Sequence, residues 1–351
     1  MHGDFSRIRP VGRFTRVLKS QGRVELDADH NELVDSLTAL RRRALADTLG
    51  RCAAPTDAPG FGLSIRDSGA TLELSAGRIY VDGIVAENPS AVDAAAQPWL
   101  PGVPLPSEDG AYAAVLEVWE RHVTAIEAPE ITEPALLGIE TTSRTETIAQ
   151  VRFEPIDRVA PLSDLACAIP DGGGSAVVMA ARAVPDPAAE DPCIVHAGAG
   201  YRGLDNRLYR VQLVAEDRFV WSRDNGAVVL PVDSVDGNSV VLGDLGRDEE
   251  LTVRPGDWVE LVGDQTELSV GMGLLTQVAP GGVDAVTRTS RLTASAVPFA
   301  GESHLRLRRW DHQGTPSVAL VDGAVPVQLD WYELEDGVQV RFGAGGQRRV
   351  G

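Results

Sequence analysis

The polar residues best placed to do chemistry form the run WSRDNG, from Trp221 to Gly226. One interpretation is that this run contains a catalytic dyad. The same run is also typical of a buried tryptophan at the end of a strand, followed by a tight turn at Asn225–Gly226. We favour this second interpretation, in which Arg223 pairs with a nearby carboxylate. The residues of this predicted structural motif are Trp221, Arg223, Asp224, Asn225 and Gly226.

A second candidate is the run DADHNE, in which Asp27, Asp29 and Asn31 alternate as in the opening of a calcium-binding loop. An EF-hand loop needs glycine at its sixth position and glutamate at its twelfth. Those positions hold Glu32 and Thr38 here. We therefore interpret these residues as the start of a helix, with Asp29 as the N-cap and Glu32 completing a capping box.

Other catalytic signatures are missing from the sequence. Its six histidines show no HExxH spacing, and its three cysteines show no CxxC spacing. It also contains no GxSxG motif and no phosphate-binding loop. We expect no metal, no cofactor and no enzymatic activity. A carbohydrate-active enzyme is the third-ranked alternative, because acidic residues are abundant enough to supply paired carboxylates.

The helix that follows Asp29 is predicted to end at Gly50, which can adopt a positive φ. Leu33, Leu37, Leu40 and Ala44 are spaced so that they share one face of it. Such a helix is about 30 Å long. Two interpretations of the apolar face stay open. It packs on its own domain, or it packs on another copy or another subunit.

The segment before the helix combines apolar and basic side chains, and it has too few turn signals to fold alone. We expect it to be ordered by lying on another surface. The predicted assembly interface comprises this arm and the helix, and its residues are Phe5, Arg7, Phe14, Arg16, Val17, Leu18, Arg23, Leu33, Leu37 and Leu40.

Charge is unevenly distributed along the 351 residues. The net charge is −19, yet residues 1–51 hold ten Lys or Arg against seven Asp or Glu. The strongly acidic remainder would repel phosphate backbones, so we expect no nucleic-acid partner. No apolar run is long enough for a membrane span, and the first residues show no secretory signal peptide. These features predict synthesis in the cytoplasm.

The rest of the chain is predicted to be mainly β. Alternating strands are expected at 71–75, 78–81, 84–87, 112–123 and 144–155, with a turn at Asp82–Gly83. We predict an N-terminal arm and long α-helix followed by two or three small β-sandwich or barrel modules. The predicted domains are the arm and helix (1–50), a β domain (51–160), a connection rich in Pro, Ala and Gly (161–199), and a second β domain of one or two modules (200–351).

Several motifs resemble a bacterial family of uncharacterised function. They are GYRGLDNRLYRV at 200–211, VWSRDNGAVV at 220–229, PGDWVEL at 255–261, LRRWD at 307–311 and LEDGVQVRF at 334–342. Members of this family commonly occur among genes for contractile injection systems, the phage-tail-like particles. The N-terminal arm is also similar to the opening of many baseplate and tail-fibre proteins.

The resemblance implies a structural subunit of such a particle, at the baseplate or fibre attachment, in contact with other particle subunits. It implies a homo-oligomer, with a trimer favoured by analogy with tail fibres, in a particle that is cytoplasmic or released. The alternative is a glycan- or surface-binding module of the same particle, which would use aromatic side chains such as Trp310, Trp331 and Tyr332.

Overall fold

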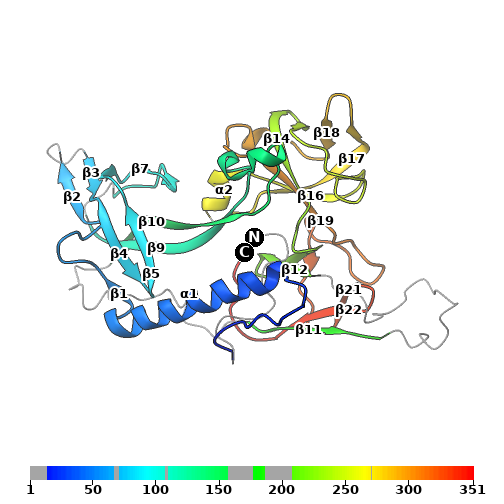
Figure 1. Ribbon diagram of the computed structural model, residues 1–351. Helices are drawn as coiled ribbons and strands as arrows, with labels where there is room; N and C mark the ends of the chain where they lie inside the picture. Colours follow the sequence, from blue (N-terminus) through cyan, green and yellow to red (C-terminus); the bar gives the residue numbers. More distant parts are fainter. Residues whose placement is uncertain (1–13, 67–70, 107–109, 157–176, 186–207, 270) are drawn as a thin grey trace. The chain divides into compact units, whose positions relative to one another are not determined.

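The computed structural model describes residues 14–66, 71–106, 110–156, 177–185, 208–269 and 271–351 (Figure 1). The chain divides into two compact units. We call residues 4–169 the N-terminal unit, and residues 170–351 with the first three residues the C-terminal unit. Strands dominate both, so the predicted mainly β class is confirmed. Most of the predicted connection at 161–199 lies outside the described residues.

The N-terminal unit begins with helix α1, Asp27–Leu49. The predicted N-cap is wrong. Leu26 occupies the capping position without a side-chain hydrogen bond, and Asp29 lies inside the first turn. Acidic side chains in the first turn are favourable there because they face the positive end of the helix dipole. The predicted end is correct, since Gly50 has φ 82° and its N–H donates to the carbonyl of Ala46.

Short strands follow α1 in three small antiparallel groups. Strands β4 (Gly77–Val81) and β5 (Ile84–Asn88) are joined by the predicted turn, in which Asp82 has φ 47° and Gly83 has φ 76°. The groups are β1 (Cys52–Ala53) with β4 (Gly77–Val81) and β5 (Ile84–Asn88), β2 (Leu63–Arg66) with β3 (Thr71–Leu74) and β6 (Val92–Asp93), and β7 (Ala96–Gln97) with β8 (Leu100–Pro101).

The longest strands of the N-terminal unit are the paired strands β9 (Ala111–Val123) and β10 (Arg144–Ile156). They pair over their whole length, from Arg144 opposite Val123 to Ile156 opposite Ala111. Between them lie two 3₁₀ turns, η2 (Pro129–Ile131) and η3 (Pro134–Leu136).

A closed six-stranded antiparallel barrel forms the first module of the C-terminal unit. Its interior is lined by aliphatic side chains such as Leu242, Leu261 and Leu307, all fully buried. Closure removes the exposed strand edges of an open sheet. Around the barrel the strands are β14 (Val229–Asp236), β15 (Ser239–Leu242), β18 (Thr289–Leu292), β17 (Leu274–Asp284), β16 (Trp258–Val262) and β19 (Arg306–Trp310). Helix α2 (Asp264–Leu268) and the turn η4 (Val297–Phe299) complete it.

Two three-stranded sheets form the second module and share one core. One sheet contains β12 (Tyr209–Ala215), β13 (Arg218–Arg223) and β20 (Val325–Pro326). The other contains β11 (Met179–Ala183), β22 (Val338–Phe342) and β21 (Tyr332–Glu335).

Strand β13 is buried on both faces. Phe219 and Trp221 point into the core of the two sheets, whereas Val220 packs with Trp310 and Ala324. Successive side chains of β13 point to opposite faces. Since Trp310 is the last residue of barrel strand β19, β13 contacts the core of the two sheets on one face and the barrel on the other.

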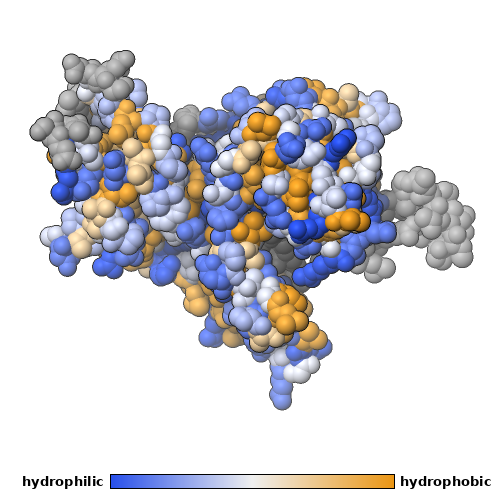
Figure 2. Space-filling view, turned by 90° about the horizontal axis from the view of Figure 1, so that it is seen from above, coloured by the Kyte–Doolittle hydropathy of each residue, from blue (hydrophilic) through white to orange (hydrophobic). Residues whose placement is uncertain are grey.

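The visible surface mixes hydrophilic and hydrophobic residues over both units (Figure 2). Among the described residues, no helix is long and apolar enough to cross a membrane.

Candidate functional site

One face of α1 exposes the leucines that the sequence places on a common stripe. We call Leu33, Leu37, Leu40 and Ala44 the leucine face. Leu37 is 55% exposed and Leu40 is 42% exposed, and Ala44 is exposed too. Leu33 is half-buried, and the adjacent Val34 is 47% exposed. Exposed large apolar side chains grouped on one helix face are typical of an interaction surface.

The opposite face of α1 packs on the strands of the same unit. The buried residues of α1 are Ala28 and Ser36. Arg42 forms an ion pair with Glu120 of β9. A Cβ atom added to Gly83 would lie 2.2 Å from the carbonyl oxygen of Arg42, so the backbone of α1 touches the β4–β5 turn. Helix α1 therefore packs on its own unit, but not through its leucines.

This packing face was not predicted from the sequence, although a signal was present. Ala28, Ala39 and Ala46 are small residues on the side of α1 opposite the leucines, the side that also carries Arg42. Small side chains let a helix backbone approach its neighbour closely, as Arg42 approaches Gly83.

The described part of the arm is largely exposed. Phe14 is 57% exposed, and Arg16, Leu18 and Arg23 are also exposed, whereas Val17 is half-buried. The other two predicted interface residues, Phe5 and Arg7, lie outside the described residues. The arm and the leucine face thus belong to one unit and present apolar side chains to solvent.

The WSRDNG motif is placed at the end of β13, as predicted. Trp221 is 3% exposed and packs in the core of the two sheets, 6.0 Å from the ring of Tyr209. Asp224, Asn225 and Gly226 all have positive φ, of 50°, 54° and 70°. Asn and Asp tolerate this conformation better than most residues do, which explains their positions in the turn.

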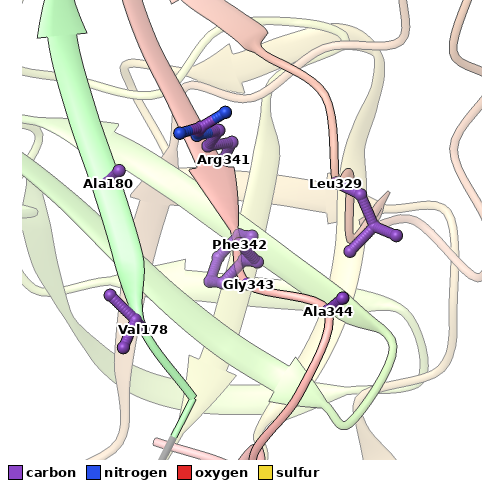
Figure 3. Close-up of a pocket in the computed structure, with 7 residues that line it drawn as sticks. All are labelled: Val178, Ala180, Leu329, Arg341, Phe342, Gly343 and Ala344. Atoms are coloured by element: carbon purple, nitrogen blue, oxygen red, sulfur yellow. The ribbon is translucent and has the colours of Figure 1, made fainter.

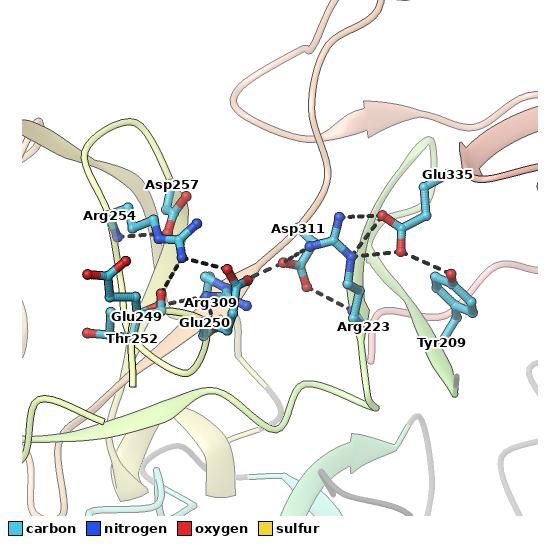
Figure 4. A network of polar contacts seen from close by, with 10 residues as sticks. All are labelled: Tyr209, Arg223, Glu249, Glu250, Thr252, Arg254, Asp257, Arg309, Asp311 and Glu335. Atoms are coloured by element: carbon cyan, nitrogen blue, oxygen red, sulfur yellow. Dashed lines mark hydrogen bonds and ion pairs between the residues drawn. The ribbon is translucent and has the colours of Figure 1, made fainter. Parts of the chain in front are cut away.

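Arg223 is held by two carboxylates of its own chain (Figure 4). Its Nε donates to both oxygens of Glu335, at 2.7 and 2.8 Å. Its backbone N–H donates to Asp311 at 2.8 Å. The hydrogen bonds to Glu335 raise the pKa of Arg223, while burial raises the pKa of Asp311.

This network continues in both directions (Figure 4). Tyr209 donates to Glu335 at 2.9 Å. On the other side, Asp311 pairs with Arg309, whose guanidinium donates to the carbonyls of Glu250 and Thr252. Each charged group named here is occupied by a partner, so the network is suited to joining strands rather than to reacting with a substrate.

The barrel contains a second charged cluster that the sequence analysis did not identify. Glu260 accepts hydrogen bonds from Arg308 at 3.1 Å and from the Trp310 indole at 3.2 Å, and all three residues are buried. The available signal was Glu260, which is the one charged residue in the otherwise apolar strand WVELV, Trp258–Val262. Burial also lowers the pKa of the neighbouring Arg210 to about 10, with the Arg308 charge contributing.

The aromatic side chains considered for glycan binding are engaged within the chain. Trp310 and Tyr332 are buried. The guanidinium groups of Arg182 and Arg341 lie 4.1 and 4.7 Å from the centre of the Trp331 ring. Stacked arginines occupy ring surface that a sugar would need, so these residues do not form an open aromatic platform.

A hollow of about 300 Å³ lies beside strands β11 and β22 (Figure 3). Val178 and Ala180 line one side of it, while Leu329 lies on the other side of β22. Arg341 is the only ionisable residue among those that line it. This lining offers neither a nucleophile nor a general base.

The structure also bears on the calcium alternative. Asp27, Asp29 and Asn31 lie on a regular helix and not in a loop. Within the described residues, no cluster of three or more His, Cys, Asp or Glu side chains could hold a metal ion.

Comparison of the whole sequence with known families gives one match, to a family of unknown function (DUF6519), over residues 1–169 and 174–351. The chain belongs to this family. No curated protein and no solved structure is significantly similar to it. The family match covers the arm, α1, the barrel and the WSRDNG motif, so these features belong to one family architecture.

Proposed function

We propose that this member of DUF6519 is a structural subunit of a contractile injection system or a related phage-tail-like particle. It sits at the baseplate or at the attachment of a fibre, and it assembles through its N-terminal arm and α1. The observation that carries the proposal is the leucine face, which is exposed on a helix whose other face is fixed to its own unit.

Two further observations support an assembly role. The arm places Phe14 and Leu18 in solvent next to Arg16 and Arg23, a combination suited to an acidic partner surface. The clusters of charged residues elsewhere are internally paired. The barrel and the two-sheet module are then the small β modules carried by the attachment segment.

The particle context rests on the sequence motifs at 200–211, 220–229, 255–261, 307–311 and 334–342, which resemble proteins encoded beside contractile injection systems. In this context the chain acts as a homo-oligomer that contacts other particle subunits.

The test is a complementation experiment in a bacterium that makes the particle and lacks its own copy of this gene. Cells receive the full-length chain or a chain lacking residues 1–26, and purified particles are quantified by mass spectrometry. We expect the full-length chain in particles at a fixed stoichiometry, and the shortened chain to fold but to be missing from them. Particles that never contain the full-length chain would refute the proposed function. Particles that contain the shortened chain at normal stoichiometry would refute the role of the arm.

A further inference from the structure

The leucine face of α1 carries charges of opposite sign at its two ends. Asp27 and Asp29 flank it near the start of the helix, and Arg41 and Arg43 flank it twelve or more residues later. Asp27, Arg41 and Arg43 are exposed. Asp27 and Arg41 lie on one side of the leucine face, and Asp29 and Arg43 lie on the other, because fourteen residues make almost four complete turns.

We propose that α1 pairs with α1 of a second copy in antiparallel orientation, through the leucine face. This inference rests on one part of the proposed function, namely that α1 is a surface used for assembly. It deepens that function by naming the partner of this face and the direction in which the partner runs.

The apolar residues fit this arrangement. When Leu33 of one copy lies opposite Leu37 of the other, Leu40 lies opposite His30, and Leu26 lies opposite Ala44. The spacing of four, three and four residues along Leu33, Leu37, Leu40 and Ala44 is the spacing of a helix pair that packs side by side.

The charges select the antiparallel direction. In the same register, Asp27 of one copy lies beside Arg41 of the other, and Asp29 lies beside Arg43, so each pair of helices has four favourable contacts. The helix dipoles also oppose each other. A parallel bundle, including the trimer expected from tail fibres, would instead gather the acidic ends together and the arginine-rich ends together.

Cysteine trapping tests the direction, in a chain whose Cys52, Cys167 and Cys193 are replaced by Ser. Leu33 of one copy lies directly opposite Leu37 of the other in the proposed pair, so an equimolar mixture of Leu33→Cys and Leu37→Cys chains is expected to form a disulfide-linked heterodimer on mild oxidation. Two copies of Leu40 would be offset by about 15 Å along the axis of an antiparallel pair, which is too far for a disulfide. Efficient trapping by Leu40→Cys, with no heterodimer in the mixture of Leu33→Cys and Leu37→Cys chains, would establish a parallel bundle and overturn the proposal.

Charge reversal tests the proposed contacts by sedimentation of the full-length chain. Asp27→Arg with Asp29→Arg turns all four contacts repulsive, and we expect a dissociation constant raised about tenfold or more. Arg41→Asp with Arg43→Asp should weaken association similarly, and an equimolar mixture of the two variants should restore it. If each variant associates like the wild type, or if the mixture stays monomeric, the proposal is wrong. The restoring mixture also separates lost contacts from a helix that fails to form.

These experiments distinguish a failure of the antiparallel pair from a failure of the proposed function. A chain that is monomeric in solution at every concentration tested but is incorporated into particles would refute the antiparallel pair alone. A chain that forms the pair in solution but never enters particles would refute the particle role alone.

Discussion

Arg223 donates from Nε to both carboxylate oxygens of Glu335, at 2.7 and 2.8 Å, and so joins strands β13 and β21 of two different sheets. Glu335→Gln removes the charge that these hydrogen bonds depend on. We expect the free energy of unfolding to fall by about 1–2 kcal/mol, measured by urea denaturation. Asp217→Asn is the matched control, because Asp217 is exposed where it pairs with Arg218 and the loss of this pair should lower the free energy of unfolding far less. Equal losses in the two variants would contradict a structural role for the Arg223–Glu335 pair.

Trp221 fills the shared core of the two sheets beside Phe219 and Tyr332. Trp221→Ala should lower the free energy of unfolding by about 3–5 kcal/mol, because it leaves a cavity in a packed core. Thermal denaturation followed by circular dichroism measures this loss. A variant that keeps its melting temperature but loses a binding or catalytic activity would show that WSRDNG is a functional site instead.

His312 is fully buried, with its Nε2 2.6 Å from the carbonyl oxygen of Gly323 and its ring stacked on Trp258. Burial lowers its pKa from 6.5 to about 4. The unfolded chain therefore takes up a proton first as the pH falls, and the folded state loses about 3 kcal/mol of stability between about pH 6.5 and pH 4.

Denaturation at several pH values should detect this loss, and His312→Gln should flatten the dependence within that range. An unchanged pH dependence in the variant would contradict the assignment. NMR titration of the His312 ring provides a direct second measurement.

Gly83 holds the β4–β5 turn against α1. Its φ is 76°, and an added Cβ would lie 2.2 Å from the carbonyl oxygen of Arg42. Gly102 has the same kind of backbone, with φ 75°, but an added Cβ would meet no atom within 4 Å. Both Ala variants pay the strain of a positive φ. We expect Gly83→Ala to cost about 1–3 kcal/mol more than Gly102→Ala and to make α1 more sensitive to protease. Equal effects would show that α1 is not closely packed on this turn.

The arginines of the arm are predicted to attach it to an acidic surface. Arg16→Glu with Arg23→Glu should reduce incorporation into particles, and the reduction should be greater when assembly takes place at low salt. Arg247→Glu is a control outside the arm. If neither change reduces incorporation into particles, the arginines of the arm do not contribute to attachment through their charge.

Local structure followed closely from local sequence. The Asp82–Gly83 and Asn225–Gly226 turns were predictable because few residues adopt positive φ, and Gly50 ended α1 for the same reason. Strands β9 and β10 were predictable from their alternating residues. The start of α1 was misplaced because Asp29 resembles an N-cap, whereas the helix extends back to Asp27 and buries Ala28.

The tertiary structure decided which side of α1 faces its own unit. The leucines form the more apolar stripe, yet Ala28 and Ser36 are the buried residues of the helix, and the backbone of Arg42, on the side opposite the leucines, is what meets Gly83. Gly83 and Glu120 are distant from α1 in sequence, so no helical pattern could reveal them. The partners of Arg223 could not be predicted for the same reason. Asp311 and Glu335 follow it by 88 and 112 residues, and only the folded sheets bring these charges together.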